Sequence, residues 1–188
     1  MRIAIGAVVL FGFAGCAASP SLAPRQYLDE TTAATVTVAA EPWVFTPEVG
    51  ASGAIAMDRR ARDFLTLYAI DVNRQGDHKQ YLSVLHSAPP LEWSAEAVPT
   101  LRLRFSGEEI TLSSPVADGR RLGIAQPIAP SYSLESKWWF YPVDKTVLKR
   151  LAAARELSAN LSAETKALGY TLWRDAGPQV AELTAILP

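Results

Sequence analysis

Apolar and polar side chains alternate along several short stretches of this chain, and a period of two residues predicts β-strands. The alternation is clearest in residues 101–105 (LRLRF), where leucine and phenylalanine would face a core and two arginines would face water. Turn-forming residues separate one stretch from the next. We expect about eight strands, drawn from residues 35–38, 43–45, 63–72, 80–86, 101–105, 110–112, 122–125, 137–141 and 168–173.

Residues 63–72 form the longest β-favouring run, and they carry apolar side chains on both faces. The turn-forming sequence NRQGD follows at residues 73–77, and a second apolar run returns at residues 80–86. This order predicts a β-hairpin. Because both faces of its first strand are apolar, we expect that strand to lie in the centre of a sheet, covered on both sides.

Near the C-terminus the apolar period lengthens to three or four residues, which predicts helices. Asp144 can cap the first helix. Its apolar positions are Val147, Leu148, Leu151 and Ala154. Residues 175–178 (DAGP) can open a final helix. Its apolar face consists of Val180, Leu183, Ile186 and Leu187. Residues 157–161 fit either a helix or a strand. We expect an α+β, β-rich fold, with a mostly antiparallel sheet or sandwich of about eight strands and two C-terminal helices.

The composition predicts one folded domain without a metal or disulfide framework. Of the 188 residues 49% are hydrophobic and 20% are charged, which is enough apolar material for a sizeable core. The formal net charge of −1 does not provide the positive field that a nucleic-acid partner requires, so we expect no such partner. A single Cys excludes a disulfide framework and a Cys-rich metal site, and two His leave little for a histidine-based metal centre. No cofactor is expected.

Residues 1–16 (MRIAIGAVVLFGFAGC) have the layout of a secretory signal, with one cation, an apolar run of 11 residues and small residues before a cysteine. As a helix the apolar run spans about 16 Å, too short for a hydrocarbon core of roughly 30 Å. Its last four residues, FAGC, resemble a bacterial lipobox, in which the signal is removed and the cysteine is acylated. We expect a signal peptide over residues 1–15 and lipidation of Cys16 by acyl chains such as palmitate. An ordinary secretory signal cleaved near Ala18–Ser19 is the alternative.

The residues after Cys16 predict the membrane to which the protein is delivered. Two or three acyl chains hold a protein on a membrane almost irreversibly, at on the order of 0.8 kcal/mol per buried methylene. Ala17 and Ala18 follow the cysteine and no Asp does. By resemblance to lipoproteins of two-membrane bacteria, this implies the inner leaflet of the outer membrane, facing the periplasm. Residues 16–26 would form a flexible tether and residues 27–188 a single β-rich domain.

A block of four consecutive aromatic residues is the most distinctive local feature of the chain. It consists of Trp138, Trp139, Phe140 and Tyr141. On a strand, the first and third rings would face one way and the second and fourth the other. One interpretation is that both faces pack inside the domain; the other is a stacking platform for sugar rings or a protein partner. Peptidoglycan or another envelope protein would be such a partner, and these four residues are the candidate binding residues.

Motifs for hydrolysis or metal binding are weak in this chain, which lacks the G-x-S-x-G elbow of a serine hydrolase. Ser83 lies three residues before His86, which places the two side chains on opposite faces of a strand. Asp77, His78 and His86 could converge on a metal ion, but a solvated His78 in the turn and a hydrogen-bonded His86 at a core edge are the simpler interpretation. No catalytic residue and no metal ligand are therefore assigned. A periplasmic hydrolase with a dispersed Ser/His/Asp site is the alternative function.

Two arginine clusters, in residues 59–62 and 120–121, are candidates for contact with anionic headgroups or lipopolysaccharide phosphates. Asp58 and Asp63 flank the first cluster. Neutralisation of these charges on a solvated face is therefore the alternative interpretation.

Three segments of the chain carry a family resemblance. They are residues 27–36 (YLDETTAATV), 61–65 (ARDFL) and 73–76 (NRQG). Together they resemble a group of uncharacterised proteobacterial lipoproteins with a lipobox-type signal and a domain of unknown function. The resemblance implies the envelope compartment and a single-domain organisation, and it implies no activity. We therefore expect a lipid-anchored envelope protein that is a non-enzymatic binding or assembly module.

Overall fold

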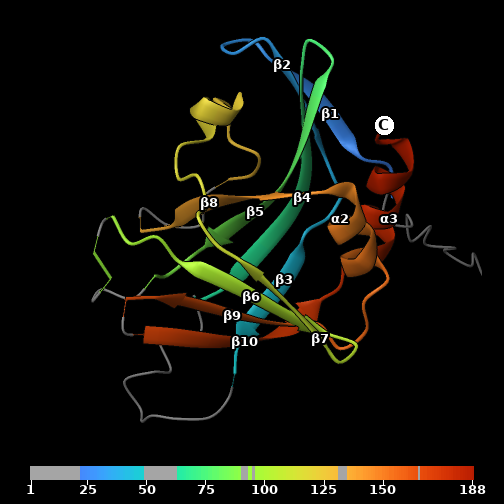
Figure 1. Ribbon diagram of the computed structural model, residues 1–188. Coiled ribbons are helices and arrows are strands. Elements are labelled where there is room, and N and C mark those ends of the chain that lie inside the picture. The colour runs from blue at the N-terminus through green and yellow to red at the C-terminus, as the bar shows by residue number, and fades with distance from the viewer. Residues whose placement is uncertain (1–21, 49–62, 90–92, 95, 131–134, 165) are drawn as a thin grey trace, which may run out of the picture.

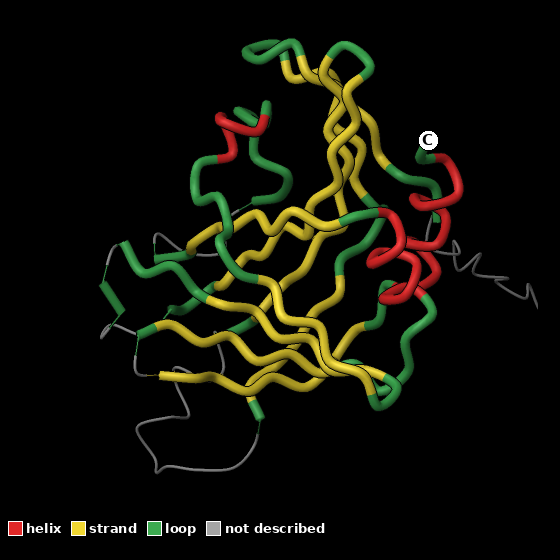
Figure 2. Tube along the Cα trace, in the orientation of Figure 1, coloured by secondary structure: helices red, strands yellow, loops and turns green. Residues whose placement is uncertain are grey.

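In the part of the chain that the structure describes, the fold is one antiparallel ten-stranded sheet with two α-helices, shown by a computed structural model (Figures 1 and 2). The structure describes residues 22–48, 63–89, 93–94, 96–130, 135–164 and 166–188. The predicted signal peptide, the predicted lipidation site Cys16 and the first arginine cluster lie outside the described residues. Among the residues that are described, no helix combines the length and the apolar character needed to cross a membrane.

The elements follow one another in a strand-rich order that ends on a helix. The strands are β1 (Arg25–Asp29), β2 (Ala34–Val38), β3 (Trp43–Pro47), β4 (Leu65–Arg74), β5 (Asp77–His86), β6 (Thr100–Phe105), β7 (Glu108–Leu112), β8 (Lys137–Val143), β9 (Ser158–Ala163) and β10 (Lys166–Arg174). The helices among the described residues are the 3₁₀ turn η1 (Gly119–Leu122), α2 (Lys145–Ala152) and α3 (Gly177–Ile186). The predicted β-rich, antiparallel fold class with two helices is confirmed.

Strand β4 is the centre of the sheet. Along one edge it pairs with β5 over its full length, from Leu65 opposite His86 to Arg74 opposite Asp77. Its other edge is shared, because β3 pairs with its first residues and β2 with its last. From β3 the sheet continues through β10, β9, β6 and β7, whereas β8 adds to the outside of β5. The predicted hairpin is therefore confirmed, and its turn at Gln75 and Gly76 has positive φ at both residues, as a tight two-residue hairpin requires.

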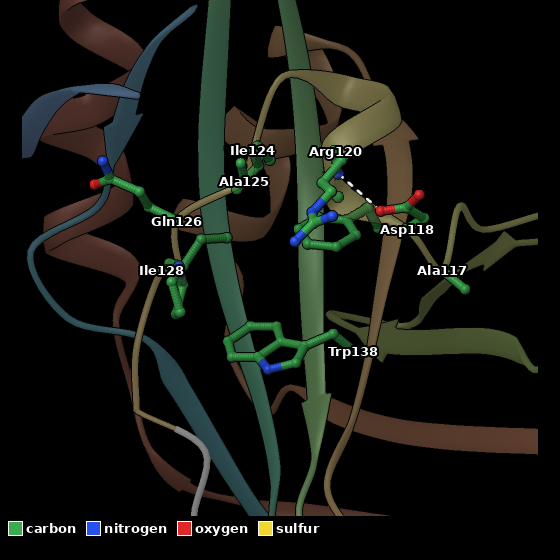
Figure 3. Close-up of a pocket in the computed structure, with 11 residues that line it drawn as sticks. Ala117, Asp118, Arg120, Ile124, Ala125, Gln126, Ile128 and Trp138 are labelled. Atoms are coloured by element: carbon green, nitrogen blue, oxygen red, sulfur yellow. Dashed lines mark hydrogen bonds between the residues drawn. The ribbon is translucent and has the colours of Figure 1, made fainter. Parts of the chain in front are cut away.

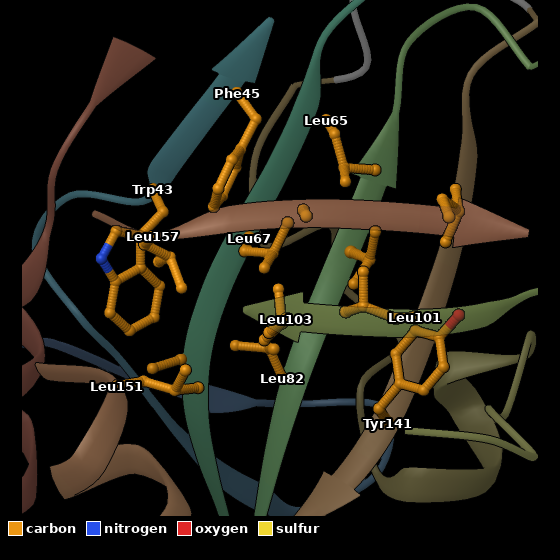
Figure 4. Packing of buried hydrophobic residues seen from close by; sticks show 14 of the residues in the cluster. Trp43, Phe45, Leu65, Leu67, Leu82, Leu101, Leu103, Tyr141, Leu151 and Leu157 are labelled. Atoms are coloured by element: carbon orange, nitrogen blue, oxygen red, sulfur yellow. The ribbon is translucent and has the colours of Figure 1, made fainter. Parts of the chain in front are cut away.

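The two faces of β4 are buried in two separate hydrophobic cores, as its apolar pattern predicts. The larger core lies where β3, β4, β5 and β8 face β6, β9 and β10, and α2 and α3 contribute to it (Figure 4). It includes Trp43, Leu67, Leu101 and Leu151. The smaller core lies on the other face of β2, β4, β5 and β8, and residues of the η1 region pack on it. The η1 region that covers the smaller core forms one wall of the site described below.

Both predicted helices are present, and their caps explain where they begin. Asp144 accepts a hydrogen bond from Val147 N at 2.7 Å and so caps α2. The Asp175 carboxylate accepts bonds from Gly177 N at 2.9 Å and from the Trp43 indole at 3.0 Å, which joins the start of α3 to β3. One predicted core position is wrong, because Ile186 is 63% exposed at the end of α3.

Two further expectations need correction. Residues 122–125 do not form a strand, because they end η1 and leave it through Gly123, whose φ of 96° is incompatible with a strand. Strand β1 begins at Arg25, inside the segment expected to be a tether, because residues 25–29 pair along β2 from Val38 to Ala34. The ambiguous stretch after α2 is strand β9, with alternating burial that fits the two-residue period.

Candidate functional site

The aromatic block lies on β8 and its side chains divide between the two cores, as the alternation predicts. Trp139 and Tyr141 belong to the larger core, and the Tyr141 hydroxyl donates a hydrogen bond to Pro99 O at 2.9 Å. Burial raises the pKa of the Tyr141 phenol. These two candidate binding residues are therefore buried in the larger core, and Phe140, which is 5% exposed, is buried in the smaller one.

Trp138 and Phe140 lie on the opposite face and line a pocket. Their ring planes are nearly parallel, at 15°, and their centroids are 6.3 Å apart. Tyr68 of β4 supports Trp138 from the side, with a centroid distance of 5.9 Å. Trp138 is half-buried whereas Phe140 is buried, so Trp138 is the ring of the block with the most surface left for a partner.

The pocket lies between β8 and the segment of residues 117–128 that includes η1 (Figure 3). Its volume is about 290 Å³. Its apolar wall includes Trp138, Phe140, Ile124 and Ile128. The polar groups come from Asp118, Arg120 and Gln126. The lining therefore combines flat apolar surface with a few polar groups, which is typical of small-ligand sites.

Local sequence explains why η1 forms here. Asp118 caps it by accepting a bond from Arg120 N at 3.0 Å. Gly119 sits so close to Phe140 that a Cβ atom would lie 3.2 Å from the ring and 2.8 Å from Ile124 O. Gly123 ends the turn in the left-handed region that favours glycine. Gly119 thus lets η1 lie directly on Phe140, whereas Gly123 lets the end of the turn pack closely on Ala34 of β2.

Asp29 fixes the far end of the pocket wall to the N-terminal hairpin. One carboxylate oxygen accepts bonds from Ala125 N at 2.6 Å and Gln126 N at 2.8 Å, and the other accepts from Thr31 N and Thr32 N, both at 3.1 Å. Desolvation acts to raise the pKa of Asp29, but the hydrogen bonds from these backbone donors outweigh it and hold the pKa below its ordinary value. The wall that carries Gln126 is therefore held by a buried carboxylate at the end of β1.

Two more contacts complete this attachment. The Thr32 hydroxyl donates to Gly123 O at 2.6 Å. Val116 and Phe140 exchange a pair of backbone hydrogen bonds, each 2.9 Å long, which ties the start of the wall to β8. The wall is thus held at both ends, by β8 at one and by the β1–β2 turn at the other.

A second polar cluster surrounds His86 at the end of β5. Its Nε2 atom lies 2.8 Å from Asp63 Oδ1 and 2.8 Å from the Tyr170 hydroxyl, and Tyr170 also bonds to Asp63 at 3.1 Å. The rings of Trp93 and Trp139 lie at centroid distances of 6.0 and 6.4 Å. The expected hydrogen-bonded histidine at a core edge is confirmed, and His86 is fully buried.

The His86 cluster has no serine hydroxyl among its bonded partners within the described part of the chain. Ser83 lies on the other face of β5 and is itself buried, with an unpartnered Oγ. The Ser87 hydroxyl is bound to the backbone of Phe64. The Asp63 carboxylate already bonds His86 Nε2, and the free Nδ1 atom is buried without a partner. The arrangement therefore does not assemble a Ser/His/Asp triad around His86.

The other candidate metal ligands also have separate partners. His78 lies in β5 rather than in the turn, and its Nδ1 atom is 2.8 Å from the buried Asp71 carboxylate, which also accepts from Gln80. Asp77 pairs with Lys79 at 3.1 Å on the surface. Within the described residues, no group of three or more His, Cys, Asp or Glu side chains is placed to hold a metal ion.

Comparison of the chain with family models, with curated proteins and with solved structures gave no match. The geometry of the site is therefore the basis for assigning a role. Sequence reasoning identified Trp138 and Phe140 but missed the wall that makes them part of a pocket. Asp118 is an N-cap residue before η1 and Gly123 is a C-cap glycine after it, and this pair of helix boundary signals could have revealed the turn.

Proposed function

We propose that this protein is a lipid-anchored, non-enzymatic protein of the cell envelope that binds glycan chains in the pocket beside Trp138. The observation that carries the proposal is the pair of near-parallel rings, Trp138 and Phe140, at the base of a pocket with a partly polar lining. A sugar ring has C–H faces that pack on aromatic rings and hydroxyls around its edge that need hydrogen-bond partners. Arg120 and Gln126 are polar groups of the kind those hydroxyls require.

The size of the pocket supports one sugar unit as the group that enters it. A volume of about 290 Å³ lies just below the usual range for ligand pockets, roughly 300–1,000 Å³. One unit of a longer chain would occupy the pocket while the rest of the chain lies outside. This geometry suits a polymer such as peptidoglycan better than a large compact ligand.

The proposed anchor brings the domain near such a polymer. Acylation of Cys16 would hold the chain on the inner leaflet of the outer membrane, and the residues before β1 would connect the anchor to the sheet. The eight residues between Cys16 and β1 would span about 28 Å at most if fully extended, so the pocket would stay close to the membrane surface. Peptidoglycan in the periplasm is therefore the proposed partner.

Replacing Trp138 with alanine is expected to weaken binding to peptidoglycan by about tenfold or more, because the stacking surface is lost. The measurement is co-sedimentation of the full-length protein with purified peptidoglycan sacculi over a range of protein concentrations. Trp173→Ala is the matched control, since Trp173 is exposed and does not line the pocket. Equal binding of the Trp138→Ala and wild-type proteins, or absence of wild-type binding, would contradict the proposal.

Replacing Cys16 with alanine is expected to abolish incorporation of radiolabelled fatty acid, because the thiol is the proposed site of acylation. The measurement is autoradiography of the immunoprecipitated protein from cells grown with labelled palmitate. Cys16→Ala protein should also leave the membrane fraction. A wild-type protein that takes up no label would overturn the lipid anchor without affecting the glycan site.

A further inference from the structure

We infer that the sugar unit bound in this pocket carries a free carboxylate and that Arg120 binds that carboxylate. The inference rests on the proposed glycan site and adds the chemical class of sugar that the site selects. It requires a cation that lines the pocket, that is accessible and that is not already neutralised.

Arg120 meets these three conditions. It lines the pocket and its side chain is exposed. Its backbone N–H bonds to Asp118, but the described residues provide no hydrogen bond or ion pair to its guanidinium. By contrast, Arg104 and Arg174 on the same protein pair with glutamates at 3.0 and 3.5 Å. Among the described residues, none uses the hydrogen-bonding capacity of the Arg120 guanidinium, and a ligand in the pocket could use it.

The direction of the two charged side chains at the pocket supports an anionic ligand. Figure 3 shows the Arg120 guanidinium extending toward the space above Trp138, whereas Asp118 lies on the side away from Trp138. One oxygen of the Asp118 carboxylate is held by the N–H of Arg120 as the cap of η1. The acidic group thus has a structural role at the rim, and the basic group faces the ligand space.

The chemistry of the guanidinium selects a carboxylate over a hydroxyl. A planar guanidinium donates two parallel hydrogen bonds to a carboxylate, and such charge-assisted pairs are about twice as strong as neutral ones. With the sugar ring on Trp138, a carboxylate substituent at the ring edge would meet Arg120 at the pocket rim. Two kinds of glycan carry this group: peptidoglycan strands whose stem peptides have been removed, which expose a lactyl carboxylate, and polysaccharides that contain uronic acids.

The experiment measures affinity by calorimetry with the full-length protein in detergent micelles and three disaccharides. The first is a peptidoglycan disaccharide with a free lactyl carboxylate, the second is its methyl ester, and the third is a uronic-acid disaccharide. We expect the wild-type protein to bind the free acid about tenfold more tightly than the ester, as one charge-assisted pair predicts. Comparing the first and third ligands tells which source of carboxylate the pocket prefers.

The Arg120→Gln variant should bind acid and ester equally. Glutamine can still donate hydrogen bonds, but it lacks the positive charge and the planar guanidinium that donates two parallel bonds to a carboxylate. Arg121→Gln is the matched control, since Arg121 is the neighbouring exposed arginine and does not line the pocket. It should discriminate like the wild type. Circular dichroism of both variants checks that each is folded.

Two results would overturn the inference: equal wild-type affinity for acid and ester, or discrimination that survives Arg120→Gln. Either of them leaves the glycan site standing if both sugars still bind and Trp138→Ala removes the binding. If neither the acid nor the ester binds to the wild-type protein, the proposed function itself fails. The two failures are therefore distinguishable within one set of titrations.

Discussion

Replacing Trp139 with alanine is expected to destabilise the domain by about 3–5 kcal/mol. Trp139 is only 3% exposed and lies in the larger core, where its ring is 6.5 Å from the ring of Trp93 and 6.4 Å from that of His86. Removing the indole leaves a cavity among these rings, and the rigid sheet around it can close only in part. Domains of this kind have a total free energy of unfolding of about 5–15 kcal/mol, so this single substitution removes a large share of that stability.

The measurement is urea-induced unfolding followed by far-ultraviolet circular dichroism. Trp173→Ala is the control for the same chemical change, because Trp173 is 64% exposed and its replacement should alter the free energy of unfolding by about 0.5 kcal/mol. Trp139→Phe should lower the free energy of unfolding less than Trp139→Ala, since the phenyl ring fills most of the cavity. Comparable losses for Trp139→Ala and Trp173→Ala would contradict the assignment of Trp139 to the core.

Replacing Asp29 with alanine is expected to destabilise the domain by about 2–4 kcal/mol. The carboxylate is fully buried and is the acceptor for the N–H groups of Ala125, Gln126, Thr31 and Thr32. Alanine would leave these donors without a partner, and an unsatisfied buried donor costs about 1–3 kcal/mol. Because two of the donors belong to the pocket wall, the variant should also lose affinity for glycan under conditions in which it is still folded.

The pH dependence of stability gives an independent check on Asp29. Its pKa is lower in the folded protein than in the unfolded chain. Its contribution is therefore present in full above the unfolded value of about 3.9, and it is lost as the pH falls from there through the folded pKa. The free energy of unfolding of the wild-type protein should fall more steeply over this acidic range than that of Asp29→Asn.

Urea-induced unfolding at neutral and at acidic pH measures both the destabilisation by Asp29→Ala and the pH dependence of stability. Asp77→Ala serves as the control, because Asp77 is exposed and its pair with Lys79 lies on the surface. That change should have little effect at any pH, as surface pairs contribute about 0–1 kcal/mol. If Asp29→Ala were as stable as Asp77→Ala, the account of how the pocket wall is held would be wrong.

Features that depend on neighbouring residues could be predicted from the sequence. The alternation in residues 101–105 correctly gives a strand with leucines inward, since the burial of β6 alternates in the same way. The same two-residue period correctly separates Trp138 from Trp139, which lie on opposite faces of β8. In both cases the geometry of an extended strand fixes the side to which each side chain points.

Features that depend on distant contacts could not be predicted in this way. The pocket wall is held by Asp29, which lies 96 residues before Ala125 in the chain. The partner of His86 at the buried cluster is Tyr170, which lies 84 residues later. Only the tertiary packing of the covering segment and of distant strands brings such residues together, and the amino-acid pattern around each one does not specify that packing.

The strand expected at residues 122–125 was wrong for a related reason. Ile124 is buried and Leu122 is partly buried, which a two-residue pattern also predicts. Their burial comes from packing on the face of β2 and β4 rather than from pairing in the sheet. Apolar spacing alone does not distinguish a covering loop from a short strand, and the positive φ of Gly123 decides between them.

The most direct test of the glycan site is the nuclear magnetic resonance spectrum of the indole N–H groups. The chain has five tryptophans, so the full-length protein labelled with ¹⁵N in detergent micelles gives five indole signals to follow as the peptidoglycan disaccharide is added. We predict that the Trp138 signal, assigned by its loss in Trp138→Phe, shifts on titration. The signal of Trp43, whose indole bonds to Asp175 inside the protein, should stay in place. A titration in which the Trp138 signal does not move, or in which the exposed Trp173 responds in its place, would contradict the account.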